Sequence, residues 1–386
     1  MTGKDAMGII FPNFHDASLP ELVDHRTTAS IPFGGRYRMI DFPLSGMTGA
    51  GIRNIGVIVR ENYQSLMGHL GSGREWDLSS KRGGLTIFPP FGREGGVEYR
   101  GRIQGLASVM QYLQEKRESL VVMSDCNIAC DLDYRALIEA HLESGADVTA
   151  VYERAPIKEG MQNDNYTFRL DAEHFVKEVR INDYRKGMQN VSMEFYVIGR
   201  ELLIAIVKEA MVRGHYNFIA DVLSKNLKKY KMFGYEYTGY RARIYDMRSY
   251  FEENLRLLET GNLDALFPEE RPVYTKVRDE APVRYAIDAK VFKSMLADGC
   301  IIEGEVEHSV LFRGVRVGKG AVIKDCVIMQ GTQIGPGAVL QNVVTDKNVV
   351  VGPGQHLTGA ANFPVFVGKN STVGAPPAPA ATAKKE

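Results

Sequence analysis

The sequence predicts two architectures in one chain: an α/β domain with a mostly parallel sheet in residues 1–260 and a left-handed parallel β-helix in residues 286–374. Short apolar runs that alternate with helical patterns predict the first. A repeat with a spacing of 17 residues predicts the second. Residues 261–285 are charged, contain prolines and show no clear period, so we expect a linker. The Ala/Pro/Lys-rich tail, residues 375–386, is expected to be disordered.

Short apolar runs mark the strands of the α/β domain. The run AMGIIF at residues 6–11 has no polar alternation, which is typical of a strand covered on both faces. The expected strands are residues 6–11, 56–60, 85–91, 120–124, 146–152 and 191–198, with a hairpin over 166–181. The expected helices are residues 61–70, 105–115, 134–144, 201–210, 218–228 and 249–259. Ligands of such sheets bind at the carboxyl ends of the strands, so functional residues should follow them.

The C-terminal part follows a different pattern. Three lines of sequence, residues 309–318, 326–335 and 343–352, align without gaps, and aliphatic residues recur within them about every six positions. The repeating residues are Leu311, Val317, Ile323, Ile334 and Leu340, with glycine at Gly318, Gly335 and Gly352. This is the hexapeptide pattern of a left-handed parallel β-helix. A single coil cannot bury its apolar face alone, so we expect several coils to stack.

Composition excludes several classes of function. Lys plus Arg and Asp plus Glu both number 47, so the zero net charge gives no reason to expect nucleic acid or a membrane surface as a partner. The N-terminus lacks a signal-peptide pattern, and no apolar run approaches the roughly 20 residues of a membrane span. Four cysteines, Cys126, Cys130, Cys300 and Cys326, are few for this length and indicate reduced thiols in a cytoplasmic protein. Cys126 and Cys130 lack a second Cys/His pair for zinc.

Residues 30–52, SIPFGGRYRMIDFPLSGMTGAGI, carry the strongest motif. The pair Gly34–Gly35 allows a backbone of positive φ, and the apolar run after Arg38 predicts a helix against the sheet. This stretch closely resembles the PFGGKYRIIDFxLSNxxNSGI segment of bacterial ADP-glucose pyrophosphorylases, which join glucose 1-phosphate to ATP. The resemblance covers roughly residues 6–374, and it implies a nucleotidyltransferase-like, Rossmann-like domain followed by the β-helix.

The first loop departs from the chemistry that this resemblance implies. The family's loop, AGGxGTRLxxLTxxxAKPAxPFGG, offers backbone N–H groups to phosphates and places an Arg and a Lys against them. In this chain Asn13, Phe14 and Asp16 replace the three glycines. Ser18 stands at the position of the catalytic Arg and Thr28 at that of the Lys. Together these changes predict a loop that no longer supports nucleotidyl transfer.

The metal and sugar positions implied by the resemblance have changed as well. Cys126 replaces the Asp of the family's SGDHIY segment, and Arg243 replaces the Asp of YWRDVGT, where a cation would repel Mg²⁺. Asp125 could substitute, although a neighbouring strand residue points to the opposite side. Glu194 takes the place of a glycine against the sugar. Asp125, Asn127 and Glu194 remain candidates for ligand binding.

The resemblance is greatest to the family's non-catalytic GlgD-type subunits. It implies a regulatory subunit of glucose-1-phosphate adenylyltransferase in glycogen biosynthesis, which activates a catalytic partner in a hetero- or homotetramer. We expect no cofactor of its own, with Mg²⁺ in the catalytic partner. Two alternatives stay open: an active sugar-nucleotide pyrophosphorylase that uses Asp125, and an assembly or ligand-sensing protein without turnover.

Several charged residues allow both a functional and a structural interpretation. Arg26, Arg36 and Arg38 could bind a sugar phosphate or nucleotide effector, but salt bridges with Asp24 or Asp41 are favoured. Asp125 and Asp221 could be the remnant of a metal pair, although carboxylates at helix ends or in loops are more common. The β-helix residues His308 and His356 are expected to face solvent rather than to catalyse acyl transfer.

Overall fold

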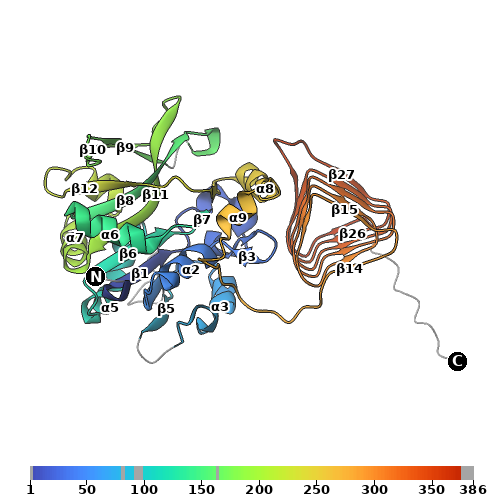
Figure 1. The fold of residues 1–386 in the computed structure, drawn as a ribbon, viewed down its shortest axis with the longest axis horizontal. Helices are drawn as coiled ribbons and strands as arrows, with labels where there is room; N and C mark the ends of the chain where they lie inside the picture. The colour runs from blue at the N-terminus through green and yellow to red at the C-terminus, as the bar shows by residue number, and fades with distance from the viewer. Residues whose placement is uncertain (1–2, 80–82, 91–98, 162–164, 375–386) are drawn as a thin grey trace. The chain divides into compact units, whose positions relative to one another are not determined.

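The computed structural model describes residues 3–79, 83–90, 99–161 and 165–374, drawn as a ribbon in Figure 1. The chain forms two compact units that interleave in sequence. The first contains residues up to Ile31, Arg38–Tyr245 and Asp264–Lys276; the second contains Pro32–Tyr37, Asp246–Leu263 and the chain from Val277 onward. Two segments of the range 1–260 thus belong to the second unit, and part of the expected linker belongs to the first unit. The tail 375–386 lies outside the described residues.

A nine-stranded sheet forms the centre of the first unit. β1 (Ala6–Phe11) pairs in parallel with β4 (Asn54–Ile58) and β6 (Leu120–Asp125). The remaining strands are β5 (Gly84–Phe88), β8 (Val148–Pro156), β9 (Tyr166–Leu170), β10 (Val176–Ile181), β11 (Met188–Gly199) and β12 (Met232–Glu236). Parallel pairs β4–β5 and β8–β12 confirm the mostly parallel sheet. Two strands run in the opposite direction: β11 is antiparallel to β6, β8 and β9, and β10 is antiparallel to β9.

Helices pack against this sheet (Figure 1). They are α1 (Pro20–Val23), α2 (Asp41–Gly49), α3 (Gln64–Leu70), α4 (Arg102–Ser108), α5 (Met110–Glu115), α6 (Tyr134–Ser144) and α7 (Arg200–Val212). The bounds of α6 match the predicted helix because its ends carry strong local signals. The Asp133 side chain accepts hydrogen bonds from the backbone N–H groups of Arg135 and Ala136, and Gly145 ends the helix with a φ of 59°.

Two predicted helices differ from the structure. Residues 105–115 do not form one helix: α4 and α5 are separate, and Val109 between them has φ −107° and ψ 21°, outside the helical region. The helix expected over 218–228 is a short π-helix, η6 (Phe218–Leu223), capped by the Asn217 side chain. Hydrophobic periodicity predicted helical structure in both ranges, but it does not report where the pattern of backbone hydrogen bonds changes.

The sheet brings the ends of two strands together. β1 and β6 are parallel neighbours, with Phe11 opposite Asp125, so their carboxyl ends lie at the same edge. A second, two-stranded ribbon follows, in which β7 (Ile128–Cys130) pairs with β13 (Arg241–Arg243). The loop after β1 and the first turn of α4 supply the remaining side chains at this edge. The fold thus assembles the candidate site from segments that are far apart in sequence.

The second unit contains the β-helix (Figure 1). Its short strands, β14 (Arg284–Tyr285) to β29 (Thr372–Val373), form three parallel sheets in which every third strand pairs. Ile323, for example, lies opposite Val306 and Leu340 in neighbouring coils. The predicted repeating residues, Leu311, Val317, Ile323, Ile334 and Leu340, are all buried and share one core. The hexapeptide prediction is confirmed.

The glycine pair of the 30–52 motif belongs to the second unit. Gly34 and Gly35 have φ values of 57° and 78°, a conformation that favours glycine. The Gly34 N–H donates to Asn254 Oδ1 over 3.1 Å, and Tyr250 Oη donates to the Pro32 carbonyl over 2.8 Å. Both partners lie on α8 (Met247–Arg256). The motif therefore fixes a turn against α8 before the chain enters α2.

Part of the expected linker is ordered and packed. It contains a short helix, α9 (Asn262–Leu266), whose last residue is fully buried. Arg271 forms an ion pair with Asp131, and the Tyr274 N–H donates to Ser45 Oγ over 2.8 Å. These contacts hold residues 264–276 on the first unit. None of the helices that the structure describes is long and apolar enough to span a membrane.

Candidate functional site

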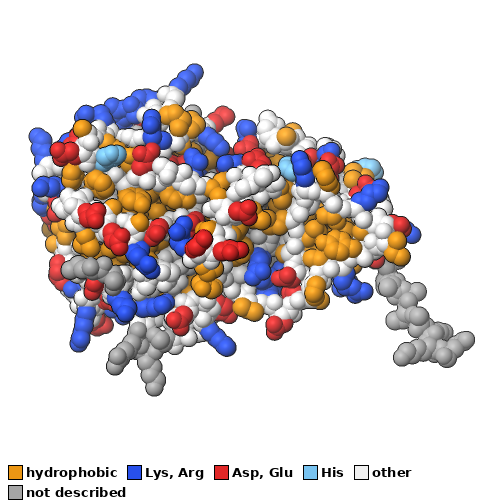
Figure 2. Space-filling view, viewed as in Figure 1, with side chains coloured by type: hydrophobic (Ala, Val, Ile, Leu, Met, Phe, Trp, Pro, Cys, Tyr) orange, Lys and Arg blue, Asp and Glu red, His pale blue; other side chains and the backbone are white. Residues whose placement is uncertain are grey.

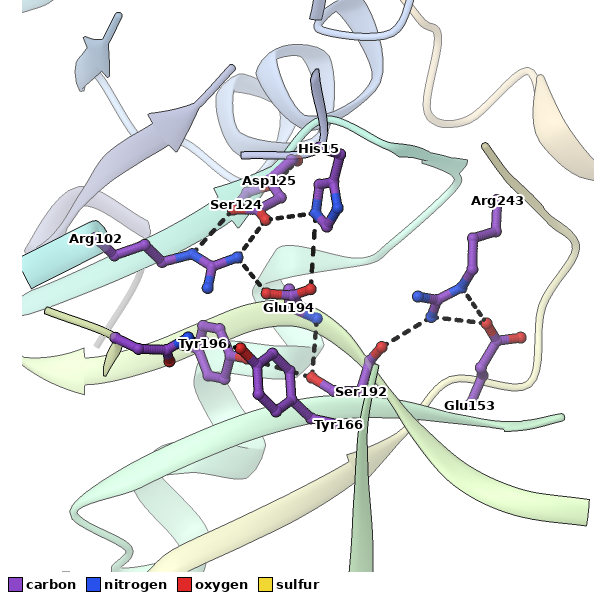
Figure 3. Close-up of polar contacts among 11 residues, drawn as sticks. His15, Arg102, Ser124, Asp125, Glu153, Tyr166, Ser192, Glu194, Tyr196 and Arg243 are labelled. Atoms are coloured by element: carbon purple, nitrogen blue, oxygen red, sulfur yellow. Dashed lines mark hydrogen bonds and ion pairs between the residues drawn. The ribbon is translucent and has the colours of Figure 1, made fainter. Parts of the chain in front are cut away.

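A buried arginine occupies the edge where β1 and β6 end (Figure 3). Arg102, in the first turn of α4, forms ion pairs with Asp125 at the end of β6 and with Glu194 on β11. Its Nε also donates to Asp125 Oδ1 over 3.2 Å. All three side chains are at least nine-tenths buried. One guanidinium thus neutralises two carboxylates that would otherwise be buried side by side.

The loop after β1 closes this arrangement. His15 Nε2 lies 2.9 Å from Asp125 Oδ2 and 3.6 Å from Glu194 Oε1. The ring of Phe14 lies 4.9 Å from Arg102 Cζ, which is within the range of a cation–π contact. We call His15, Arg102, Asp125 and Glu194 the closed network. Its charged groups pair with one another.

Within the closed network, the electrostatics favour the ionised forms of Arg102 and Asp125. Burial alone would raise the pKa of Asp125, but the charge of Arg102, together with His15, holds it below its ordinary value of 3.8. Burial would likewise lower the pKa of Arg102, but Asp125 and Glu194 raise it well above its ordinary range. Both groups stay charged at neutral pH because each stabilises the other. Removing either one would leave an uncompensated buried charge.

A second carboxylate organises the loop itself. Asp16 Oδ1 accepts hydrogen bonds from the Thr28 backbone N–H over 2.8 Å and from Thr28 Oγ1 over 2.6 Å. Asn13 Nδ2 donates to the other oxygen of Asp16 over 2.6 Å. Burial raises the pKa of Asp16, ahead of these hydrogen bonds, which lower it. The loop therefore folds around a negative charge that belongs to the chain.

Glu194 has an unusual backbone. Its φ is 61°, in the left-handed region that glycine adopts readily and glutamate rarely does. The residue sits at an irregularity of β11, where the pairing with β8 shifts between Ser192 and Tyr196. The Glu194 N–H donates to Ser192 Oγ over 3.1 Å. The bend turns the Glu194 carboxylate toward Arg102, so the strained backbone is what completes the closed network (Figure 3).

Separate ion pairs join β13 to Glu153 on β8. Arg243 donates from Nε to Glu153 Oε1 over 2.9 Å and from Nη2 to the Ser192 carbonyl over 2.8 Å. Arg241 also pairs with Glu153, which is almost completely buried. Burial would raise the pKa of Glu153, but the two arginines, Arg243 first, hold it below its ordinary value. Arg243 is thereby engaged with Glu153 on β8.

Comparisons with known proteins agree with this fold. Residues 19–163 match the family model for nucleotidyl transferases, and residues 282–360 match that for GlmU-like C-terminal hexapeptide domains. The chain is 35% identical over 318 residues to glycogen biosynthesis protein GlgD of Geobacillus stearothermophilus, which covers 82% of each chain. It is 31% identical over 324 residues to GlgD of Bacillus subtilis, with 84% of each covered. It is 30% identical to the glucose-1-phosphate adenylyltransferase of Clostridium perfringens (strain SM101), with 85% of each covered.

The chain belongs to the GlgD and glucose-1-phosphate adenylyltransferase family.

The positions at which this family member departs from the expected motifs are accounted for in the structure. Thr28 is buried and binds Asp16, whereas Ser18 ends a short 3-10 helix and is half-buried. Cys126 is buried, and burial raises the pKa of its thiol well above the ordinary range, with Asp125, Asp41 and Asp16 adding to the effect. It is therefore a neutral thiol at neutral pH. Asn127 is also buried, and its carbonyl accepts the Ile244 N–H over 2.8 Å.

The arginines near the loop fall in different units. Arg26 and Arg38 belong to the first unit and Arg36 to the second. Arg26 is buried, and Arg38 donates from Nη1 to the Ser65 carbonyl over 2.7 Å. Arg36 is exposed and lies 5.5 Å from the Tyr37 ring. Their role in binding an effector stays a prediction.

The favoured salt bridges of these arginines were expected at Asp24 or Asp41. Asp41 pairs with His69 over 2.6 Å and accepts the backbone N–H of Arg38 over 2.9 Å. Asp24 lies 3.2 Å from the exposed His25. The salt bridges of the three arginines with these carboxylates stay a prediction.

The other candidates for a metal or catalytic role are Asp221, His308 and His356, and the structure shows where each lies. Asp221 accepts the backbone N–H groups of Tyr216 and Asn217, as a carboxylate near a helix start does. His308 Nδ1 lies 2.6 Å from Asp325 Oδ1, and His356 is exposed on the β-helix. Among residues 3–79, 83–90, 99–161 and 165–374, only His15, Asp125 and Glu194 bring three potential metal ligands together. Cys126 and Cys130 are not part of that group.

The closed network does not fit a divalent cation as it stands. Ligand atoms of His15, Asp125 and Glu194 lie within 4.8 Å of one another, a donor set that a metal could use. Arg102, however, already pairs with both carboxylates. A metal would have to displace a buried guanidinium and leave it without partners. The structure thus places a fixed cation of the chain where the carboxylates converge.

Arg102, His15 and Glu153 are the residues that the sequence did not single out. Buried carboxylates need a cation or several hydrogen bonds, so Asp125 at the end of a buried strand predicted that some partner exists. Nothing in the local sequence identifies Arg102, because it is 23 residues away and begins a different element. The neighbouring Phe14 was noted only as the replacement of a glycine, whereas its ring lies against the guanidinium of Arg102.

Proposed function

We propose that the chain is a non-catalytic, regulatory subunit of glucose-1-phosphate adenylyltransferase in glycogen biosynthesis, which activates a catalytic partner. The observation that carries this proposal is the closed network. A nucleotidyl transferase must hold phosphates and Mg²⁺ with charges that are free to meet them. Here Asp125 and Glu194 are engaged by Arg102, and Asp16 occupies the loop. We propose that Mg²⁺ is bound by the partner.

The test measures ADP-glucose formation from ATP and glucose 1-phosphate by the chain alone, by a catalytic family member alone, and by both together. We expect almost no turnover by the chain alone, since one preorganised electrostatic group contributes about 10²–10³ in rate and several have changed. We expect the mixture to exceed the catalytic member alone. A mixture with the same rate as that member would refute the activating role, whereas turnover by the chain alone at about 1–10³ per second would refute its impairment.

The alternative of an active pyrophosphorylase would need Asp125 to bind a metal. That requires Arg102 to leave a buried position in which two carboxylates hold it. The second alternative, a ligand-sensing protein without turnover, predicts nucleotide or sugar-phosphate binding with no effect on any partner. Equilibrium binding of ATP and glucose 1-phosphate, measured beside the mixing assay, separates this alternative from the activating subunit.

We propose further that the protein is cytoplasmic and assembles through its β-helix into a hetero- or homotetramer. The first coils expose large apolar side chains: Tyr285 is 57%, Ile287 103% and Phe292 62% exposed. Phe292→Asp should reduce assembly in size-exclusion chromatography with light scattering. The exposed Val212→Asp on α7 is the control. Point variants are preferable to deleting the β-helix, because α8 belongs to the same unit and would lose its partner.

A further inference from the structure

A cavity lined by arginines lies at the outer part of the sheet, apart from the closed network. Its volume is about 310 Å³, near the lower limit for small-molecule sites. Its lining residues are Arg154, Phe168, Arg169, Leu170, Arg180, Arg185, Met188, Gln189 and Asn190, and none of them belongs to the closed network. Figure 2 shows Lys and Arg side chains gathered over the part of the first unit where Figure 1 places β9 and β10.

The cavity forms where two strands separate. In the described part of the chain, β11 and β9 pair at one register position, Val191 with Thr167. Beyond it, the Asn190 side chain bridges the strands by donating to the Phe168 carbonyl over 3.1 Å. Arg154 lies opposite Asn190 on β8. The strands β8, β9 and β11 therefore carry arginines to the cavity that opens where β9 and β11 separate.

Three of the four guanidinium groups are held in place. Arg169 and Arg180 share one carboxylate, Glu178, at 3.0 and 2.8 Å. Arg185 pairs with Asp183, whose side chain is almost completely buried. Asp183 itself accepts the hydroxyl of Thr167 over 2.6 Å. Such anchoring reduces the entropy that these long side chains would lose on binding a ligand.

The cavity carries a surplus of positive charge. Four arginines line it, and two carboxylates, Glu178 and Asp183, compensate them. Arg154 is exposed and has no ion pair with any carboxylate among the described residues. The surplus of two charges matches a phosphate monoester, which carries about −1.5 to −2 at neutral pH. Guanidinium groups bind phosphate oxygens through paired hydrogen bonds.

We propose that this cavity, between β8, β9, β10 and β11, is a binding site for a phosphate dianion, either free or as the monoester of a small metabolite. The site is independent of the closed network and does not rest on the function proposed there. Met188, which is 57% exposed, offers an apolar surface beside the arginines for the organic part of an ester.

The test is calorimetric titration of the full chain at constant ionic strength with inorganic phosphate, pyrophosphate and glucose 1-phosphate, each separately. We expect at least one to bind, and the ester to bind more tightly than inorganic phosphate if a metabolite is the ligand. Arg154→Gln should weaken binding about tenfold to a hundredfold, the value of a charged hydrogen bond. Arg117→Gln, a change of equal charge at another exposed arginine, should leave it unchanged.

Several outcomes would overturn the proposal. One is the absence of binding by all three phosphate probes at millimolar concentration. Another is equal binding by wild type and Arg154→Gln. Loss of binding in Arg36→Gln but not in Arg154→Gln would assign the anion to the second unit instead. Binding of polyglutamate but of no phosphate probe would identify an acidic polypeptide surface. Since Arg154 makes no ion pair in the described structure, its replacement should leave the fold intact, which thermal unfolding checks.

Discussion

The closed network and the β-helix are both buried and both well ordered, but they are specified in different ways. In the β-helix, Leu340 lies between Ile323 and Leu357 of the adjacent coils, and similar aliphatic residues repeat along the stack. In the closed network, the single guanidinium of Arg102 pairs with both Asp125 and Glu194. Truncating one side chain of an apolar column leaves the neighbouring coils in contact, whereas removing one charge leaves its partners buried and uncompensated. The two regions should therefore respond differently to substitution.

The largest effect should follow loss of the central cation. Arg102→Met leaves Asp125 and Glu194 buried without a positive partner, so we expect a loss of about 3–5 kcal/mol in the free energy of unfolding. Urea unfolding followed by the fluorescence of Trp76, the single tryptophan, reports on the first unit. Arg180→Met, which removes one partner of an exposed ion pair, is the control and should cost little stability.

A second variant tests whether the loss of stability comes from the two carboxylates left without a cation, because it removes these carboxylates as well. Arg102→Met combined with Asp125→Asn and Glu194→Gln should recover much of the stability, because no uncompensated charge remains. If Arg102→Met costs no more than Arg180→Met, the contrast between the two regions fails.

Truncating a core side chain of the β-helix should lower the free energy of unfolding somewhat less, and it should affect the second unit alone. Leu340→Ala removes a fully buried side chain and should cost about 2–5 kcal/mol through lost burial and the cavity left behind. Circular dichroism at the strand signal should report the change, while Trp76 fluorescence should not. Ile323→Ala, one coil away, should resemble it. A shift of the Trp76 transition equal to that of the strand signal would show that the units do not unfold separately.

Acid should weaken the ion pairs of the first unit. The pKa values of Asp125 and Glu153 lie below their ordinary values of 3.8 and 4.5, so their contribution to stability is complete above pH 4.5. It is lost as the pH falls through their lower, folded-state pKa values. We expect Glu153→Gln to be less stable than wild type at pH 6, with the difference shrinking as the pH falls below 4.5. A difference that stays constant across this range would contradict the assignment. Urea unfolding at about pH 6.0, 4.5 and 3.5, a range that spans the titration, provides the measurement.

The smallest stability effect concerns the backbone of Glu194. Glu194→Ala and Glu194→Gly both remove the carboxylate, but only glycine adopts a φ of 61° without strain. Glu194→Gly should therefore be more stable than Glu194→Ala by about 1 kcal/mol. Because both variants lose the same ion pair, the difference between their free energies of unfolding reports the cost of the left-handed backbone conformation at residue 194. Equal stabilities would show that the bend in β11 relaxes when the carboxylate is gone.

No gain of activity is expected from Cys126→Asp. The variant returns a carboxylate next to Asp125, but Arg102 still engages the neighbouring carboxylates and Asp16 still fills the loop. Residues that act as a unit are not additive, so ADP-glucose formation should stay near background. A large increase in this variant would mean that the closed network opens easily. Cys130→Asp, at the other buried cysteine of the first unit, is the matched control.

The strands, the helices and the β-helix repeat could be predicted from the sequence, whereas the contacts of single side chains could not. β1 and α6 match their predicted bounds because apolar runs, Asp133 and Gly145 are local signals. The β-helix was predictable because its contacts repeat. Arg102 was not, since its choice of Asp125 and Glu194 depends on how α4, β6 and β11 meet. For the irregularity in β11 the sequence did hold a signal, because Glu194 stands where the family motif has a glycine, and its φ of 61° is a conformation that glycine adopts readily.

The hydrogen-bonded carboxylate of Asp16 affects how this domain responds to dissolved anions. The carboxylate is a ligand attached to the chain that binds it, so Thr28 and Asn13 meet it at a high effective concentration that does not depend on the solution. Occupancy of the loop is therefore set by the covalent chain and stays constant while metabolite pools rise and fall. An anion that regulates such a protein gains little by competing there, and selection for responsiveness would act on surfaces elsewhere.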